Sequence, residues 1–297
     1  MFEENFLSLK ALVFYLTYPL LWLVSILPFP VIYGISNFIY YIVYHLIGYR
    51  KKVVRKNLLL CFPTKSESER LQIEKDFYRH FCDLFLEIIK SLSMSAETMK
   101  RRFKIINPEK ITEMEQHGKS IIFMAGHHAN YEWMTSFQLG PTTREGFGVY
   151  KRIRNPYFDK LIRDIRGKFF IELIDKNEIS KLMQKNCDEN ALVNYGMIAD
   201  QAPRHTKKAY WGKFMGIDTP MFVGSEIFAK RFDFGLAFIH VRKVKRGYYE
   251  AEFKEISMNP KAFKNFEITD MYFQCIEKEI RESPALYFWT HNRWKHI

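Results

Sequence analysis

Two adjacent histidines and a glutamate stand together in FMAGHHANYEWM, residues 123–134. His127 and His128 follow a short apolar run that ends in Gly126, and Glu132 comes five positions after His127. The pKa of an imidazole lies near physiological pH, so a histidine oriented by a carboxylate can take a proton from an alcohol or an amine. The spacing predicts that His127 is a general base and that Glu132 orients it.

The spacing alone leaves other interpretations open. An H-x4-E match also arises by chance, so the histidine could instead belong to a helix cap or to the core. A metal hydrolase could use His127, His128 and Glu132, but adjacent side chains diverge, and neither HExxH nor a third ligand at a typical spacing is present. The sequence also has no GxSxG and no cysteine or serine clearly placed to be acylated. Direct attack by an acceptor, without a covalent enzyme intermediate, is therefore the simpler scheme.

The elements around the motif indicate an α/β domain. The segment 120–126 is expected to be a buried strand, which would place His127 at the carboxyl end of a sheet, where open α/β folds bind ligands. Further strands are expected at 146–150, 169–174 and 191–200, with a hairpin over 233–256 that turns at Arg246–Gly247. The segment 57–103 is expected to be helical, with Ser66 or Ser68 able to cap a helix within it. Further helices are expected at 155–168 and at 219–232, the latter with Thr219 as N-cap and Pro220 at N1.

The N-terminal part of the chain is unusually apolar. No Asp, Glu, Lys or Arg occurs from Ala11 to Tyr49, and five cations then follow within Arg50–Lys56. A spanning helix needs about 20 apolar residues. Residues 11–27 are the better candidate for a span, whereas residues 31–49 suit the membrane interface or a helix packed on the domain, with a break near Pro28–Pro30. A buried helical hairpin of a soluble protein is the alternative.

These features predict a membrane-anchoring segment over residues 1–49 and a catalytic domain over residues 50–297. The cations after the apolar segment place that domain on the cytoplasmic side. The four cysteines lie far apart and are expected to be reduced; they are Cys61, Cys82, Cys187 and Cys275.

The chain is strongly basic, with a formal net charge of +12. Its cations gather at Lys151–Arg154, Arg204–Lys208 and Arg242–Arg246. Nucleic acid, anionic lipid or an acidic protein would each suit such a surface. No nucleic-acid-binding motif is recognisable, and lipid is the simplest partner beside so long an uncharged segment. A non-catalytic, membrane-attached binding protein is the remaining alternative.

Several blocks of the sequence are similar to the lipid A late (lauroyl/myristoyl) acyltransferases, a branch of the lysophospholipid acyltransferase superfamily with its HX4(D/E) motif. GHHANYE resembles the family's GH-x-x-N-[WY]-E, and the match extends over nearly the whole chain. The further matching blocks are RKNLLLCFP, VYKRIRNPYFDKLI, MIADQAP, WGKFMGIDTPMFVGSEIFAKR and PALYFWTHNRWK. Three departures, Lys151, His128 and the order WGKF, leave the reaction class unchanged but leave the identity of the acceptor open.

The resemblance implies a fold like that of glycerol-3-phosphate acyltransferase, with a central mixed sheet flanked by helices. It also implies transfer of a fatty acyl chain from an acyl carrier protein, or from acyl-CoA, to a hydroxyl of a glycolipid such as a lipid A precursor. An amino-lipid, a lyso-phospholipid or a mannosylated lipid are alternative acceptors. We expect no cofactor, no metal and no nucleic-acid partner, and a location at the cytoplasmic face of the bacterial inner membrane.

By the same resemblance His127 is the general base and Glu132 its partner. Asn130 is expected at the start of the following helix, and Asp200 and Gln201 at the end of a strand that faces the site. Oxyanion and phosphate groups need hydrogen-bond donors and cations, for which the candidates are Lys151, Arg154, Arg163 and Arg166.

Overall fold

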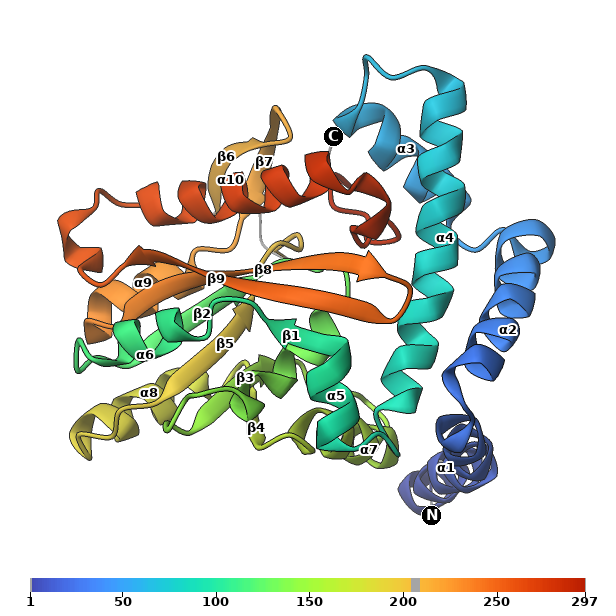
Figure 1. The fold of residues 1–297 in the computed structure, drawn as a ribbon, viewed down its shortest axis with the longest axis horizontal. Coiled ribbons are helices and arrows are strands. Elements are labelled where there is room, and N and C mark those ends of the chain that lie inside the picture. Colours follow the sequence, from blue (N-terminus) through green and yellow to red (C-terminus); the bar gives the residue numbers. More distant parts are fainter. Residues whose placement is uncertain (1, 204–208, 297) are drawn as a thin grey trace.

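A mixed sheet of seven strands forms the centre of the protein (Figure 1). The computed structural model describes residues 2–203 and 209–296. The strands lie in the order β1–β9–β8–β2–β5–β3–β4, and β8 and β9 pair antiparallel whereas the other neighbours are parallel. The predicted α/β class with a central mixed sheet is therefore confirmed. The strands are β1 (Phe103–Ile105), β2 (Ile121–Ala125), β3 (Gly146–Tyr150), β4 (Ile171–Asp175), β5 (Asn194–Ile198), β8 (Gly235–Lys245) and β9 (Tyr248–Ser257).

Helices cover both faces of this sheet, so its central strands are apolar on both sides. In β2 the side chains of Ile122 and Met124 enter one core, and those of Phe123 and Ala125 enter the other. The first core contains residues of α3 (Lys51–Cys61), α8 (Ile179–Asp188), α9 (Gly224–Phe232) and α10 (Glu267–Glu282). The second contains residues of α5 (Ala96–Arg102), α6 (Glu109–Glu115) and the 3-10 helix η2 (Tyr131–Leu139). The remaining elements near the sheet are α7 (Pro156–Gly167) and the short turns η3 (Pro260–Ala262) and η4 (Pro284–Leu286).

The long helix α4 (Glu67–Lys90) stands beside the sheet at the end where β8 turns into β9 (Figure 1). Ser66 caps it: its hydroxyl accepts from Glu69 N–H, and the Glu69 carboxylate in turn accepts from Ser66 N–H. This capping box satisfies two backbone donors that have no partner within the helix, so it fixes where α4 begins. The cap predicted at Ser66 is confirmed.

Two apolar helices precede the sheet and lie against α4. They are α1 (Phe2–Ile26) and α2 (Phe29–Tyr40), and a π-helical turn, η1 (Tyr41–Ile47), continues α2. Leu9–Ile26 and Phe29–Ile47 are each long and apolar enough to cross a membrane, with mean hydropathies of 1.7 and 1.3. In Figure 1 α1 is seen nearly end-on whereas α2 runs alongside α4, so the two helices point in different directions.

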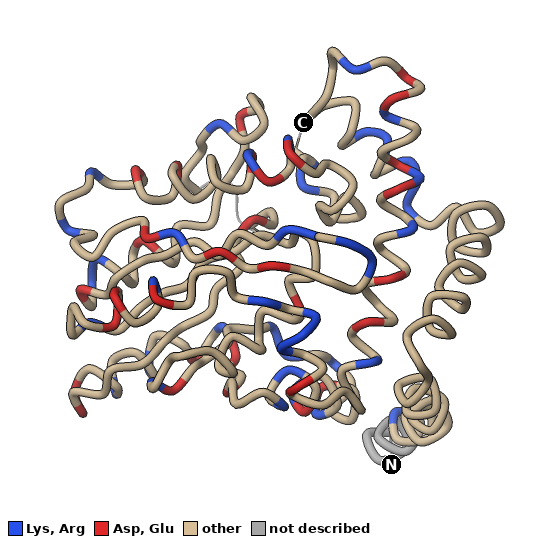
Figure 2. The backbone as a smooth tube through the Cα atoms, in the orientation of Figure 1, with Lys and Arg blue, Asp and Glu red and all other residues tan. Residues whose placement is uncertain are grey.

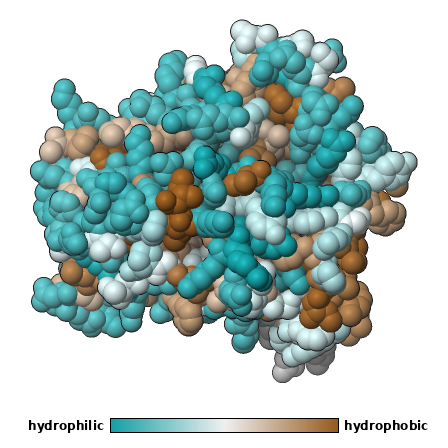
Figure 3. All heavy atoms as spheres, in the orientation of Figure 1, coloured by the Kyte–Doolittle hydropathy of each residue, from teal (hydrophilic) through white to brown (hydrophobic). Residues whose placement is uncertain are grey.

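The exposed side chains of these helices are largely hydrophobic. Leu16 and Leu20 of α1 are 67% and 62% exposed, and Phe38 of α2 is 66% exposed. Figure 2 shows almost no charge along α2 and the part of α1 that it colours, and Figure 3 shows hydrophobic side chains gathered over these helices. Monomeric soluble proteins rarely expose a continuous apolar surface of this kind.

The helix predicted to begin at Thr219 starts later than expected. Thr219 and Pro220 lie in a strand, β7 (Ile217–Met221), which pairs antiparallel with β6 (Tyr210–Phe214). The turn between the two strands uses Met215 and Gly216 with φ of 56° and 79°, the geometry of a type I′ hairpin turn. Tertiary contacts therefore outweigh the local N-cap and Pro signals, and α9 begins at Gly224.

Candidate functional site

The register of two neighbouring strands places His127 beside Asp200. β2 and β5 are parallel, and Ala125 pairs with Ile198 at their carboxyl ends. His127 comes two residues after Ala125, and Asp200 comes two residues after Ile198. Both residues therefore follow the carboxyl ends of their strands at the same edge of the sheet. This is the edge at which parallel α/β sheets place their ligands.

His127 and Asp200 form a short hydrogen-bonded pair. The Nδ1 atom of His127 lies 2.5 Å from Oδ1 of Asp200, and the backbone N–H of His127 donates to Oδ2 at 3.2 Å. Nε2 accepts from the side-chain amide of Gln201 at 3.2 Å. With the ring proton on Nδ1 facing the carboxylate, Nε2 carries the lone pair, which is the arrangement of a general base.

The carboxylate of Asp200 is deeply buried, with 1% of its side chain exposed, whereas His127 is 19% exposed. Burial raises the pKa of Asp200, but the charge of His127 and the two hydrogen bonds from this residue outweigh it and leave the pKa below its usual value. Burial, and next the negative charge of Asp200, raise the pKa values of Tyr272 and Tyr287, so both phenols stay neutral. Asp200 is therefore the fixed negative charge of the site.

Glu132 does not take the position that the sequence predicted for it. Its two carboxylate oxygens accept from Nε and Nη2 of Arg166 at 2.7 and 2.6 Å, a bidentate ion pair. The carboxylate on the imidazole is that of Asp200, which lies on the neighbouring strand. The expected contact between Glu132 and His127 is thus replaced by two separate pairs, because the turn after β2 directs Glu132 towards α7.

Hydrogen bonds to other parts of the chain fix the turn between His127 and η2. Ala129 has a φ of 50°, which costs a non-glycine residue on the order of 1–3 kcal/mol and persists only where the surroundings fix it. Its N–H donates to Leu286 O at 3.0 Å, and its carbonyl lies 3.1 Å from Nε2 of His80. Asn130 caps η2 through Oδ1, which accepts from Trp133 N–H. The predicted place of Asn130 at a helix start matches this cap.

His128 points away from His127 and into the protein. It is 3% exposed, and its two ring nitrogens face the carbonyls of Val241 and Ser283 at 3.3 and 3.2 Å. His128 is therefore a buried packing residue, and among the lining residues of the cavity beside His127 it does not occur.

A cavity of about 540 Å³ opens beside His127 and extends over the face of the sheet that bears η2. Its volume falls within the range of about 300–1,000 Å³ that small-molecule sites occupy. His127, Glu132, Arg166, Lys151 and Gln201 line the more polar part. The rest of the wall is mostly apolar, with Phe123, Met134, Phe137, Ile171, Leu173 and Ile239.

Two glycines hollow out the floor of this cavity. Gly196 of β5 and Gly148 of β3 are paired in register, with Phe123 on the next strand to one side and Leu173 on the other. All four positions line the cavity. Because neither glycine has a side chain, the cavity reaches down to the backbone of β5 and β3, between the side chains of Phe123 and Leu173.

The structure separates the basic residues that the sequence singled out. Arg166 and Lys151 line the cavity, whereas Arg154 and Arg163 are exposed and do not line it. The cluster Arg204–Lys208 lies outside the described residues. In the cluster Arg242–Arg246, Arg242 pairs with Glu250, and Lys243 and Arg246 pair with Asp83. Much of the positive charge of this cluster is therefore neutralised within the protein.

Three residues at the site were not recognised in the sequence. The ring of Tyr131 packs edge-on against His127 with 4.8 Å between centroids, Lys176 lines the cavity, and Nε2 of His291 accepts from Ala202 N–H at 3.2 Å. Tyr131 and His291 stand within the matching blocks GHHANYE and PALYFWTHNRWK, and Lys176 comes shortly after the strand predicted at 169–174. These signals marked the segments but gave no role to the three side chains.

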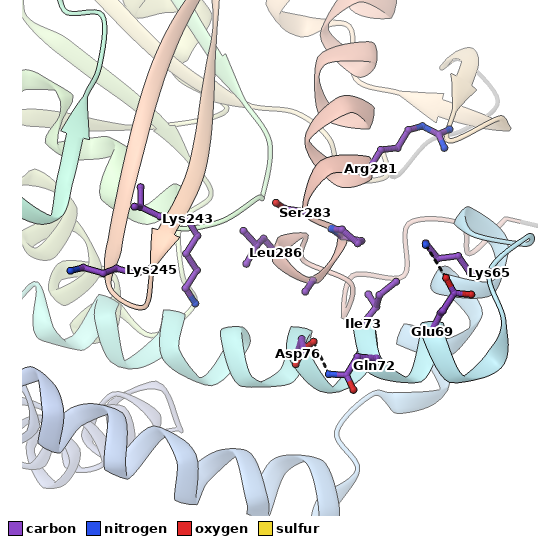
Figure 4. A pocket seen from close by; sticks show the side chains of 13 residues that line it. Lys65, Glu69, Gln72, Ile73, Asp76, Lys243, Lys245, Arg281, Ser283 and Leu286 are labelled. Atoms are coloured by element: carbon purple, nitrogen blue, oxygen red, sulfur yellow. Dashed lines mark hydrogen bonds and ion pairs between the residues drawn. The ribbon is translucent and has the colours of Figure 1, made fainter.

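A second hollow, of about 690 Å³, lies between α4, the tip of the β8–β9 hairpin and the end of α10 (Figure 4). Its polar side chains are partly paired with one another: Lys65 with Glu69 and Gln72 with Asp76 (Figure 4). None of the described histidines lines this hollow. An acid–base pair is thus present in the first cavity and not in this one.

Comparison with known proteins gives a consistent result. A family described as bacterial lipid A biosynthesis acyltransferase matches residues 1–296. The chain is 26% identical to a lipid A biosynthesis lauroyltransferase of Escherichia coli (strain K12), over 93% of this chain and 89% of the relative. It is 24% identical to a lipid A biosynthesis acyltransferase of Haemophilus influenzae, over 99% of this chain and 94% of the relative.

The site should make stability depend on pH through His291. Burial lowers the pKa of His291 from 6.5 to about 4. Between these values the unfolded chain binds a proton here that the folded chain does not, so the free energy of unfolding should fall as pH falls from 6.5 to 4. Urea denaturation at several pH values should show a shallower dependence for His291→Gln, which keeps an acceptor for Ala202. An equal change in His117→Gln, at an exposed position, would contradict this assignment.

Proposed function

The chain belongs to the bacterial lipid A biosynthesis acyltransferase family of O-acyltransferases, and we propose that it transfers a fatty acyl chain from an acyl carrier protein thioester to a hydroxyl of a lipid A precursor. The observation that carries this proposal is the His127–Asp200 pair at the mouth of an apolar cavity. The pair supplies a base, and the cavity is suited to a hydrocarbon chain.

In the proposed reaction Nε2 of His127 removes the proton of the acceptor hydroxyl as its oxygen attacks the thioester carbonyl. Asp200 holds the ring through Nδ1 and stabilises the imidazolium that forms. The tetrahedral intermediate then expels the thiolate, which takes the proton back from His127, so an ester and a free thiol result. The amide of Gln201, 3.2 Å from Nε2, is the neutral donor placed beside the reacting atoms.

We assign the apolar part of the cavity to the acyl chain. A thioester carbonyl near His127 would direct its chain across the sheet, past Gly196 and Gly148 towards Ile171 and Leu173. Burying each methylene there contributes about 0.8 kcal/mol, so the wall favours a long-chain donor over a short one.

We assign the polar rim to the charged groups of the acceptor. Lys151 and Lys176 are exposed at the cavity, and Arg166 is held in place by Glu132. Cations so placed suit the phosphate groups of an anionic glycolipid. In this assignment Glu132 contributes by orienting Arg166, whereas Asp200 orients His127.

We further propose that α1 anchors the protein in the bacterial inner membrane, with the catalytic domain at its cytoplasmic face. The rings of Phe14 on α1 and Tyr157 on α7 stack with 5.6 Å between centroids, and α7 also carries Arg166. The anchor therefore lies next to the element that lines the cavity. α2 packs along α4, whose Arg79 and Glu67 are exposed, so we place α2 at the membrane interface instead of across the bilayer.

The catalytic assignment predicts a ranking of variants. His127→Ala and Asp200→Asn should each lower kcat by roughly 10³- to 10⁴-fold, because the first removes the base and the second disturbs its tautomer. Glu132→Gln should raise KM for the acceptor more than it lowers kcat. The measurement is transfer from lauroyl-acyl carrier protein to a lipid A precursor, followed by mass spectrometry of the product. A fully active Asp200→Asn protein would rule out this mechanism.

The cavity assignment predicts a change in chain-length preference. A Cβ at Gly196 would contact only Phe147 O and Gly148 Cα, at 3.8 and 4.0 Å, so an added side chain fits the strand and fills the cavity. Gly196→Val should therefore shift the preference towards shorter acyl donors, with Gly196→Ala in between. Competition assays with carrier proteins loaded with C8 to C16 chains would detect this shift. Gly34→Ala, where a Cβ has no neighbour within 4 Å, is the control.

The membrane assignment predicts an effect of charge on α1. Leu16→Arg combined with Leu20→Arg should weaken membrane attachment, since an arginine near the centre of a span costs about 2.5–3.5 kcal/mol on insertion scales. Fractionation of cells and flotation with vesicles would measure attachment. Ile227→Arg, at a 51% exposed position on α9, should remain attached. Unaltered flotation of the double variant would exclude α1 as the anchor.

A further inference from the structure

A buried carboxylate on α4 lies directly behind the turn that carries His127. Glu87 is fully buried and accepts a hydrogen bond from the side-chain amide of Asn130 at 2.7 Å. It also accepts from the hydroxyl of Tyr249 on β9 at 2.8 Å and from that of Tyr33 on α2 at 2.9 Å. Of these three donors Asn130 belongs to the turn of residues 127–130, and the other two belong to elements that surround this turn.

Asn130 connects this carboxylate to the backbone of the turn. Its Nδ2 donates to Glu87, and its Oδ1 accepts from Trp133 N–H at 3.1 Å, so both ends of the amide are engaged. The amide is itself 0% exposed, and a lost partner would leave a buried donor unsatisfied. Next to it stands Ala129 at positive φ, a conformation that depends on being held from outside.

We propose that Glu87 is a positioning residue for acyl transfer. By accepting from the Asn130 amide it fixes the turn of residues 127–130 against α4, and thereby holds the imidazole of His127 within reach of the acceptor hydroxyl. This role deepens the proposed function and rests on it, because it acts through the base assigned there.

The role requires an acceptor at this position and does not require a negative charge. All three donors are neutral side chains. Burial raises the pKa of Glu87 to about 7, against the opposing effects of Lys243 and of the hydrogen bonds from Tyr249 and Tyr33. A glutamine could accept from Asn130 and Tyr249 through its oxygen and donate to the oxygen of Tyr33.

The variants that test this role are Glu87→Ala and Glu87→Gln, with Tyr33→Phe and Tyr249→Phe as matched controls. Each control removes one donor to the same carboxylate and leaves Asn130 in place. The assay uses the full-length protein in detergent micelles, lauroyl-acyl carrier protein as donor and a lipid A precursor as acceptor. kcat, KM and the midpoint of urea denaturation are measured for every variant.

Glu87→Ala should lower kcat by roughly 10- to 100-fold, the loss expected when a reacting group is slightly misplaced, with KM nearly unchanged. Glu87→Gln should restore most of kcat. Tyr33→Phe and Tyr249→Phe should lower the denaturation midpoint yet keep kcat close to that of the unmodified protein. Losses from Glu87→Ala and Asn130→Ala should not be additive in the double variant, since both break the same contact.

Glu87→Asp provides a second test if Glu87→Ala fails to fold. It keeps the carboxyl group but shortens the side chain by one methylene, and should also lower kcat. Unchanged kcat in Glu87→Ala or Glu87→Asp, failure of Glu87→Gln to restore kcat, or an equal loss in Tyr249→Phe would overturn the positioning role. If the unmodified protein transfers no acyl chain, or His127→Ala is as fast, the proposed function itself fails.

Discussion

The site depends on the alignment of β2 with β5, because only this register brings His127 and Asp200 into one hydrogen bond. The two residues are 73 positions apart in the chain and share no local element. A slip of one residue would turn every side chain of a strand to the opposite face of the sheet. The packing of β2 between two cores opposes such a slip, since both of its faces are fully buried.

The end of the chain is hydrogen-bonded to both of the segments that carry the His127–Asp200 pair. Phe288 N–H donates to His127 O at 3.0 Å, and His291 accepts from the backbone that follows Gln201. The side-chain amide of Asn57 in turn binds the carbonyls of Trp289 and His291, both at 2.9 Å. Residues near the beginning of the domain thus fix the C-terminal segment, and this segment closes over the strand ends that carry the pair.

Local patterns predicted the parts of the site but not their partners. The strands over 120–126 and 191–200 could be recognised from their apolar runs, so His127 and Asp200 were both expected at strand ends. Their contact requires β2 and β5 to be neighbours, and strand order is not a local property of the sequence. Glu132 was assigned to His127 because it is close in sequence, whereas the structure pairs it with Arg166, 34 residues further along. Closeness in the sequence therefore did not identify the partner of His127, which lies on the neighbouring strand.

The same limit applies to the boundary drawn at residue 49. Composition separates an uncharged segment from a charged domain, yet the few polar groups of the uncharged segment are the ones that bind α4. Ser36 donates to Asp83 at 2.7 Å and Tyr44 to Glu74 at 3.0 Å, and both acids are almost completely buried. Removing these hydroxyls would leave buried carboxylates short of donors, which costs more than an exposed polar group gains. α2 is therefore bound to the domain by its polar face, while its apolar face remains exposed.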